Sequence, residues 1–283
     1  MSVIANTAML VSLHAGQWSG RKYDASATQE LNASKHADAD ASRVNKMLVS
    51  KEVLKPAQQV INKARTEYYR LTLPWGEDGS RILPAQMYMQ WSAYLDSVQT
   101  ELADAVEVVV DSYRDAVRDA AYRMGDLFDI NDYPPPASIR SKFYLRASVR
   151  PVPTADDFRV ELTDDLQKAI KANIEADVAE LTQGAVRHLW EQVGQMIDDV
   201  RDRLADPNAR FRRGLLDNLV EMIDDLDRLN FAGDPQLSQL RADALKVITP
   251  LRDPEYLRKD WNTRQAASDD LKELADHYGG LWG

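Results

Sequence analysis

The chain has 283 residues, of which 44% are hydrophobic and none is cysteine, and its formal net charge is -10. This size and apolar content suffice for one large or two ordinary domains with a real core. The lack of thiols excludes disulfides, thiolate metal sites and cysteine catalysis. Neither a signal-peptide pattern nor an apolar run of membrane-spanning length is present. We therefore expect a soluble cytoplasmic protein with no membrane contact.

Charge is distributed unevenly along the chain. Basic residues outnumber acidic ones in 1–83 and 139–160, whereas acidic residues outnumber basic ones in 84–138 and 161–283. An acidic surface repels a polyanion over most of its area, so we expect any nucleic-acid contact to be local and salt-sensitive.

The first predicted element is a strand at Met9–Leu13, followed closely by the basic pair Arg21 and Lys22. We expect this strand to pair with a later strand near 143–150. Residues 24–50 are rich in Ala, Ser and Asp with weak periodicity, which fits one or two short helices or a mobile segment.

A helix predicted at 56–71 leads into the loop LTLPWGEDGSRILP at 71–84. The candidate interaction residues of this loop are Trp75, Glu77, Asp78 and Arg81. Such an aromatic loop can serve as a recognition tip, but Trp75 can equally pack the loop onto the core while the glycines permit a tight reversal. We favour packing.

Two long helices are predicted from apolar residues that recur every three or four positions, one at 84–125 and one at 163–204. Thr163 suits the N-cap of the second, and Asp164 and Asp165 are favourably placed against its helix dipole. We expect the two helices to pack as an antiparallel pair.

Three Asp-Pro pairs punctuate the C-terminal third, and each suits a helix start. Short helices are predicted there near 207–230, 235–249, 254–259 and 263–278. The expected fold class is mainly α: an elongated antiparallel bundle of long helices, a small antiparallel β-sheet and a C-terminal cap of short helices. The strands of that sheet are predicted near 9–13, 143–150 and 158–162. We divide the chain into 1–162 and 163–283, within one continuous elongated domain.

The segment Ile139–Arg150 alternates with a period of two. As a strand it presents an apolar face and a cationic face, and basic residues interleaved with an aromatic suit phosphate contact with base stacking. The candidate nucleic-acid-binding residues are Arg21, Lys22, Arg140, Lys142, Tyr144, Arg146 and Arg150. Edge strands also carry Lys and Arg to discourage edge pairing, which explains the same pattern without a ligand.

Local catalytic signatures are absent: the sequence has no Walker loop, GxGxxG, HExxH or nucleophile elbow. His188 and Glu191 share a helix face, but di-iron bundles place Glu before His, so a structural histidine is favoured. The aspartates between Asp104 and Asp132 suit a solvated face, with DNA mimicry as the alternative. We expect no cofactor, no metal and no catalytic residue, although carboxylate chemistry without a local motif stays open.

Several segments together resemble a family of tailed-phage and mobile-element proteins of unknown function. They are MLVSLHAGQWSGRKYD (9–24), TLPWGEDGSRILP (72–84), FYLRASVRPVPTADDFRVEL (143–162), LADPNARFRRGLLDNL (204–219) and LNFAGDPQL (229–237). The resemblance implies an origin and the cytoplasm of an infected bacterium, and it supplies no catalytic residue.

Two functions follow as hypotheses. The first is a non-enzymatic phage-type accessory protein that binds nucleic acid through the basic strand face, in replication, recombination or host takeover. The second is a helical protein-protein adaptor, a self-assembling scaffold or an acidic inhibitor of a host factor. The expected partners are accordingly nucleic acid, a host or phage protein, and further copies of the chain.

Overall fold

The computed structural model describes residues 4–160, 162–206, 213–249 and 261–282. This part of the chain is mainly helical, with long helices, a four-stranded and a two-stranded antiparallel sheet, and shorter C-terminal helices. The predicted fold class is thereby confirmed. No helix in these ranges combines the length and apolar character that crossing a membrane requires.

Contacts divide the protein into two compact units, and each unit combines stretches that are distant in sequence. Unit 1 comprises 1–12, 69–90 and 149–283, and unit 2 comprises 13–68 and 91–148.

Unit 2 is organised by α3 (Lys51–Leu71) and α4 (Tyr88–Met124), which confirm the predicted helices at 56–71 and 84–125 to within a few residues. Apolar side chains at helical spacing on the two helices share one core, because each helix has a stripe to bury. The core residues are Leu54, Ala57, Ile61 and Ala64 of α3 and Val98, Leu102, Val106 and Val109 of α4. The partner of α4 within this unit is therefore α3.

Residues 24–50 form one helix and one short strand. Asp24 is the N-cap of α2 (Ala25–Ser34), where its Oδ1 accepts a hydrogen bond from the backbone N–H of Ala27 at 2.9 Å. β2 (Arg21–Tyr23) pairs antiparallel with β3 (Asn45–Met47), and the short α5 (Pro136–Ile139) completes the unit.

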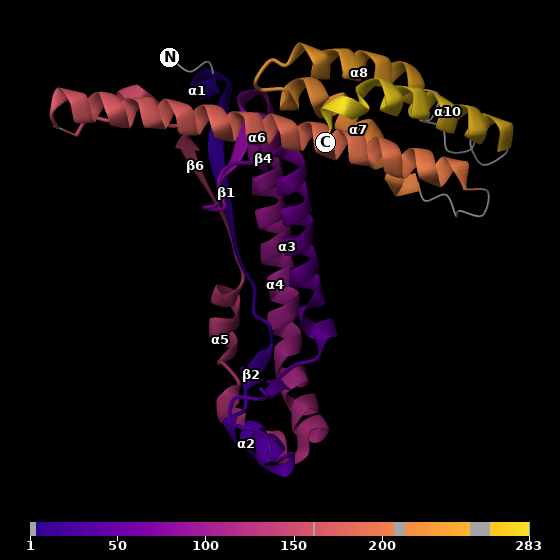
Figure 1. The fold of residues 1–283 in the computed structure, drawn as a ribbon. Helices are drawn as coiled ribbons and strands as arrows, with labels where there is room; N and C mark the ends of the chain where they lie inside the picture. Colours follow the sequence, from indigo (N-terminus) through magenta and orange to yellow (C-terminus); the bar gives the residue numbers. More distant parts are fainter. Residues whose placement is uncertain (1–3, 161, 207–212, 250–260, 283) are drawn as a thin grey trace. The chain divides into compact units, whose positions relative to one another are not determined.

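Unit 1 is organised by α6 (Asp164–Ala205), which confirms the long helix predicted at 163–204. Thr163 is its N-cap residue, although the Thr163 side chain makes no capping hydrogen bond. α6 packs with α7 (Arg213–Leu229) and α10 (Trp261–Tyr278). Figure 1 shows these helices along the second half of α6, while its first half extends beyond them.

One of the three Asp-Pro pairs, Asp234-Pro235, lies fully in the described ranges, and a helix begins there as predicted. Asp234 caps α8 (Pro235–Ile248) by accepting from the N–H of Gln236, and Pro235 occupies the first turn. α8 packs on α7 and α10. The predicted helix near 254–259 lies outside the described residues, as does the beginning of the one predicted near 207–230.

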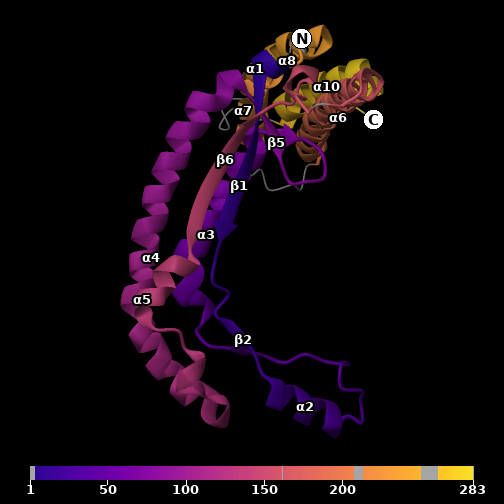
Figure 2. The same cartoon turned by 90° about the vertical axis from the view of Figure 1, so that its left-hand side faces the viewer.

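The four-stranded sheet has the order β4-β5-β1-β6. β1 (Ala8–Gly16) lies beside β6 (Tyr144–Pro151), as predicted for the strands at 9–13 and 143–150 (Figure 2). On its other side β1 pairs antiparallel with β5 (Arg81–Pro84), with Met9 opposite Leu83.

The third predicted strand, at 158–162, is not formed at any of its described positions, 158–160 and 162. The chain before it makes a 3-10 turn at Ala155–Asp157, closed by a capping box between Thr154 and Asp157. The sheet instead includes β5 and the short edge strand β4 (Leu73–Pro74), where a proline is tolerated because one edge lacks a strand partner.

Candidate functional site

Strand β6 shows the predicted alternation only at its start, because Ala147 and Ser148 are both half-buried and Val149, which the period of two places on the apolar face, is 49% exposed. Leu145 is buried, whereas Tyr144 and Arg146 are exposed on the other face. The guanidinium carbon of Arg146 lies 5.3 Å from the Tyr144 ring centroid, which is a cation-π arrangement. The Tyr144 ring lies against Gly16 of β1, where a Cβ would be only 2.6 Å from its Cδ1.

Strand β1 adds polar groups to this face. His14 Nε2 and Ser148 Oγ lie 3.4 Å apart, within unit 2. The predicted first strand ended at Leu13, so His14 and Gly16 were missed. Continuing the period of two from Ser12 through His14 to Gly16 would have placed both on the same face as Ser12.

The prediction that Arg140 and Lys142 lie on the face of the strand is wrong. Both precede the strand, in the 3-10 turn Arg140–Lys142. Arg140 makes a bidentate ion pair with Glu107 of α4, with Nε 2.6 Å from Oε1 and Nη2 2.5 Å from Oε2. These hydrogen bonds hold the pKa of Glu107 below its usual value and raise the pKa of Arg140. Lys142 is half-buried, and no carboxylate among the described residues forms an ion pair with it.

Arg21 and Lys22 lie on β2, in the separate two-stranded sheet, rather than beside β6. Lys22 Nζ lies 2.6 Å from Asp132 Oδ1, and this ion pair neutralises it. Arg21 is exposed and, within the described ranges, contacts no carboxylate. The structure therefore does not bring the basic pair into the β6 face.

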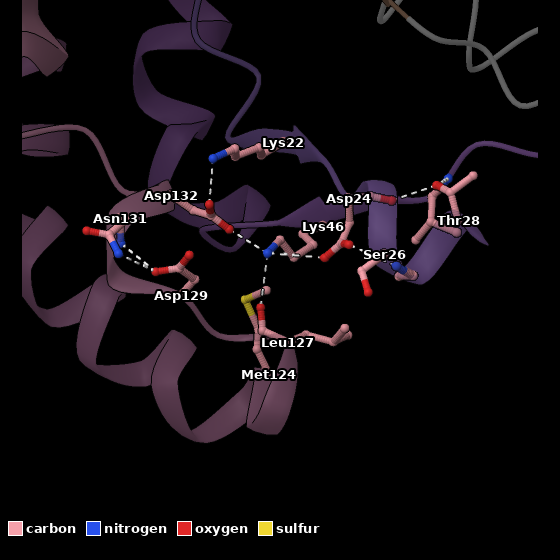
Figure 3. A network of polar contacts seen from close by, with 12 residues as sticks. Lys22, Asp24, Ser26, Thr28, Lys46, Met124, Leu127, Asp129, Asn131 and Asp132 are labelled. Atoms are coloured by element: carbon pink, nitrogen blue, oxygen red, sulfur yellow. Dashed lines mark hydrogen bonds and ion pairs between the residues drawn. The ribbon is translucent and has the colours of Figure 1, made fainter. Parts of the chain in front are cut away.

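A nearly buried lysine joins the two-stranded β2–β3 sheet to the segment after α4 (Figure 3). Lys46 Nζ lies 2.5 Å from Asp132 Oδ2 and 3.2 Å from Asp24 Oδ2, and it donates a hydrogen bond to the Leu127 carbonyl at 3.2 Å. The side chains of Lys46, Asp24 and Asp132 are 10%, 11% and 6% exposed, so each charge depends on its partners for solvation. The sequence contained no signal for this cluster.

The pKa directions in this cluster follow from the same contacts. Burial alone would raise the pKa of Asp132, but hydrogen bonds from Lys22 and Lys46 outweigh it and lower that pKa. The backbone hydrogen bond from Ala27, followed by Lys46, lowers the pKa of Asp24. The hydrogen bond to Asp132 is the main cause that raises the pKa of Lys46. All three groups are charged near neutral pH.

Arg150 belongs to unit 1, where it contacts the loop that contains the candidate interaction residues. Its Nη2 lies 2.5 Å from Ser80 Oγ and 3.4 Å from Asp78 Oδ2. Hydrogen bonds from the backbone and side chain of Ser80 are the main causes that lower the pKa of Asp78, and Arg150 adds to them. Arg150 is thus partly neutralised by an acid 72 residues away in sequence.

The rest of this loop favours packing over recognition. Trp75 is only 5% exposed. The guanidinium of Arg81 lies over the Tyr69 ring, with its carbon 4.9 Å from the ring centroid, and its Nε donates to Thr72 Oγ1 at 2.7 Å. Glu77 and Asp78 are exposed between two glycines with positive φ, Gly76 and Gly79.

The other candidate groups show structural roles. Asp115 and Arg118 form an exposed ion pair on α4, as expected for a solvated face. His188 Nδ1 lies 4.0 Å from Glu191 Oε2, and burial, with Arg81 nearby, lowers the pKa of His188. In the ranges that the structure describes, no group of three or more metal-ligating side chains is gathered.

We define the Tyr144 surface as the unit 2 residues His14, Lys142, Tyr144, Arg146 and Ser148. It combines an exposed aromatic ring with two cations for which the described residues provide no carboxylate partner. No family model, no curated protein and no solved structure matches the chain.

Proposed function

We propose that the protein is a non-enzymatic, phage-type accessory protein that contacts single-stranded nucleic acid through the Tyr144 surface. One observation carries the proposal: the 42% exposed Tyr144 ring lies beneath the Arg146 guanidinium. Because Gly16 lies against the ring and the Arg146 guanidinium lies over it, an unpaired base would stack on the guanidinium plane that the ring supports, while Arg and Lys bind the flanking phosphates.

The contacts that position the Tyr144 ring support this function. Tyr144 is confined by Gly16, and the Arg146 guanidinium is held over the ring. A guanidinium over a ring keeps its N–H edges available, so Arg146 can donate to a phosphate with little further loss of side-chain entropy. Lys142 lies just before the strand and supplies a second cation.

The proposed phosphate contacts are limited to Lys142 and Arg146, because Arg140, Lys22 and Arg150 are already paired with carboxylates. Two neutralised phosphates on a single strand predict a slope of about -1.4 for the logarithm of affinity against the logarithm of salt concentration. The net charge of -10 works against tighter binding. We therefore expect weak, local binding that favours single strands over duplexes.

Fluorescence anisotropy with a labelled oligothymidylate, and with a duplex of the same length, tests the proposal at low salt. Arg146→Glu and Tyr144→Ala should each weaken single-strand binding about tenfold, close to the 1–3 kcal/mol typical of one base-aromatic stack. Arg118→Glu is the matched control, because it makes the same charge change on an exposed part of α4 in unit 2. No binding, or equal losses for Arg146→Glu and Arg118→Glu, would exclude the Tyr144 surface.

A second candidate function is that of a helical adaptor, favoured by the exposed apolar side chains around the start of α6. Leu166 is 54% exposed, and Val160 and Leu162 are exposed beside it in sequence. Exposed apolar side chains of this kind are typical of protein contacts. Light scattering tests its self-assembling form: a mass that rises with concentration would support it, and a strict monomer would leave only a foreign partner.

A further inference from the structure

We propose that a groove along α6, in unit 1, binds a cationic amphipathic helix of a partner protein. The inference rests on the adaptor function and goes beyond it by naming the site and the chemistry of the partner. It is independent of nucleic-acid binding at the Tyr144 surface, which belongs to unit 2.

The groove consists of two hollows that share Thr182 and Gln183 of α6. The first has a volume of about 640 Å³ and is bounded opposite α6 by Ile4 and Pro153–Asp156. The second has a volume of about 420 Å³ and is bounded opposite α6 by Ala232, Asp234 and Leu281.

Together the hollows follow α6 from Ile174 to Trp190. This distance is about 24 Å at 1.5 Å per residue, or more than four helical turns. Such a length suits a helix lying along α6 better than a compact small molecule.

The floor of the groove is apolar and follows one face of the helix. Positions 174, 178, 182, 186 and 190 lie four residues apart, and all are apolar (Ile174, Val178, Val186 and Trp190) except Thr182. The same stripe continues toward the helix start as Ile170 and Leu166, and Leu166 is 54% exposed. Val178 and Trp190 are already buried, so a partner helix with apolar side chains at i, i+4 and i+8 would cover the half-buried Ile170, Ile174 and Val186 and the exposed Leu166.

Charge identifies the partner. The charged side chains that line the first hollow are Asp156 and Glu175, both acidic. The second hollow has Arg187 and Asp234, and Asp234 Oδ2 accepts a hydrogen bond from Trp190 Nε1 at 3.0 Å. The groove therefore favours Lys or Arg beside the apolar anchors, above all over the first hollow.

Two lysines limit the acidic region on the side toward the start of α6. Lys171 and Lys168 lie one and two turns before Glu175 on α6, outside the lining of the hollow. Cationic side chains of the partner are therefore expected over Asp156 and Glu175, and not beyond them toward the start of α6.

Two labelled synthetic peptides test the proposal with the full-length protein. One is a cationic amphipathic helix of Leu, Ala and Lys, and the other has Glu in place of every Lys. At about 0.15 M salt, which screens distant charges, we expect saturable anisotropy with the Lys peptide. Its affinity should be at least about tenfold higher than that of the Glu peptide. Equal affinities, or no binding, would overturn the proposal.

Matched variants on α6 locate the binding. Ala179→Trp fills the first hollow and should weaken the Lys peptide by about tenfold, whereas Ala176→Trp places the same ring outside the lining and should not. Likewise Glu175→Lys should weaken binding and Glu180→Lys should not. These four alanines and glutamates are exposed, and circular dichroism verifies that each variant folds.

Two outcomes distinguish the groove from the adaptor function itself. A partner or a self-associated form that is retained equally by wild type and Ala179→Trp would support an adaptor and reject the groove. A dimer that Ala179→Trp dissociates would instead show that a second copy of the chain occupies the groove, and this would overturn the cationic helix.

Discussion

The position of the Tyr144 ring depends on a single residue, Gly16, which has no side chain. A Cβ at Gly16 would lie 2.6 and 2.7 Å from Cδ1 and Cζ of the ring, so Gly16→Ala must displace the ring. Overpacking in a core costs about 1–3 kcal/mol, but the 42% exposed ring can move aside, so we expect a smaller loss in the free energy of unfolding in urea. Because Arg146 is positioned over the ring, affinity for oligothymidylate should fall as it does in Tyr144→Ala.

Gly184 of α6 provides the control for that substitution. A Cβ there meets no atom within 4 Å, and the residue lies within a long helix. Gly184→Ala should therefore raise the free energy of unfolding by about 0.5–1 kcal/mol and leave nucleic-acid affinity unchanged. An unchanged affinity for oligothymidylate in Gly16→Ala would contradict the role of the ring position in binding.

At this scale the sequence predicts which residues share a face, but not which charges remain available. The period of two identified Tyr144 and Arg146 as neighbours on one face of β6, and both are exposed there. The acids that pair with Arg140 and Lys22 are 33 and 110 residues away, so no local spacing could reveal them. Long-range ion pairs depend on the fold, which the pattern alone does not contain.

The Lys46 cluster connects whole elements, namely the two-stranded β2–β3 sheet, the start of α2 and the segment after α4. Lys46→Met would leave Asp24 without its lysine and Asp132 with Lys22 alone. Removing one partner of a fully buried ion pair costs about 3–5 kcal/mol, but these side chains retain some exposure and Lys22 remains, so we expect a loss of roughly 1–3 kcal/mol. Urea denaturation measures the loss.

Lys55→Met is the control for this loss. The Lys55–Glu52 pair on α3 is more than half exposed on both sides, so its removal should change the free energy of unfolding by at most about 1 kcal/mol. Equal effects of the two substitutions would show that the Lys46 cluster contributes no more than a surface pair.

The same cluster predicts a loss of stability in acid. The pKa values of Asp24 and Asp132 are lowered below the ordinary 3.8, so the unfolded chain binds protons first as the pH falls. Their stabilisation is complete above the ordinary pKa and is lost as the pH decreases through the lowered values. Urea midpoints at about pH 6 and pH 3 should therefore differ less in Asp132→Asn than in wild type. A difference in Asp132→Asn as large as that of wild type would contradict this origin of the acid sensitivity.

Element prediction succeeds where periodic signals are long. The helices at 88–124 and 164–205 were predicted to within a few residues, because many repeats of an apolar stripe leave no other period. β4 and β5 have two and four residues and each contains a proline, so their local signal is that of a loop. Their place in the sheet comes from pairing with β1, which is a tertiary effect.

The charge of the whole molecule opposes the contact that we propose at the Tyr144 surface. Asp104, Asp111 and Asp119 are exposed on α4 and are part of the net charge of -10. Replacing all three by Asn should raise the affinity for oligothymidylate several-fold at about 0.01 M salt, where the Debye length is about 30 Å. The gain should shrink toward nothing near 0.2 M, where only close charges interact.

Arg146→Glu in the background of that triple variant completes the argument. If the gain reflects weaker repulsion of strands that still bind at Tyr144 and Arg146, the added substitution must abolish it at every salt concentration. Binding that survives Arg146→Glu would show that lower repulsion had exposed another surface to the polyanion. A gain of equal size at low and high salt would contradict a long-range origin, because screening acts on distant charges first.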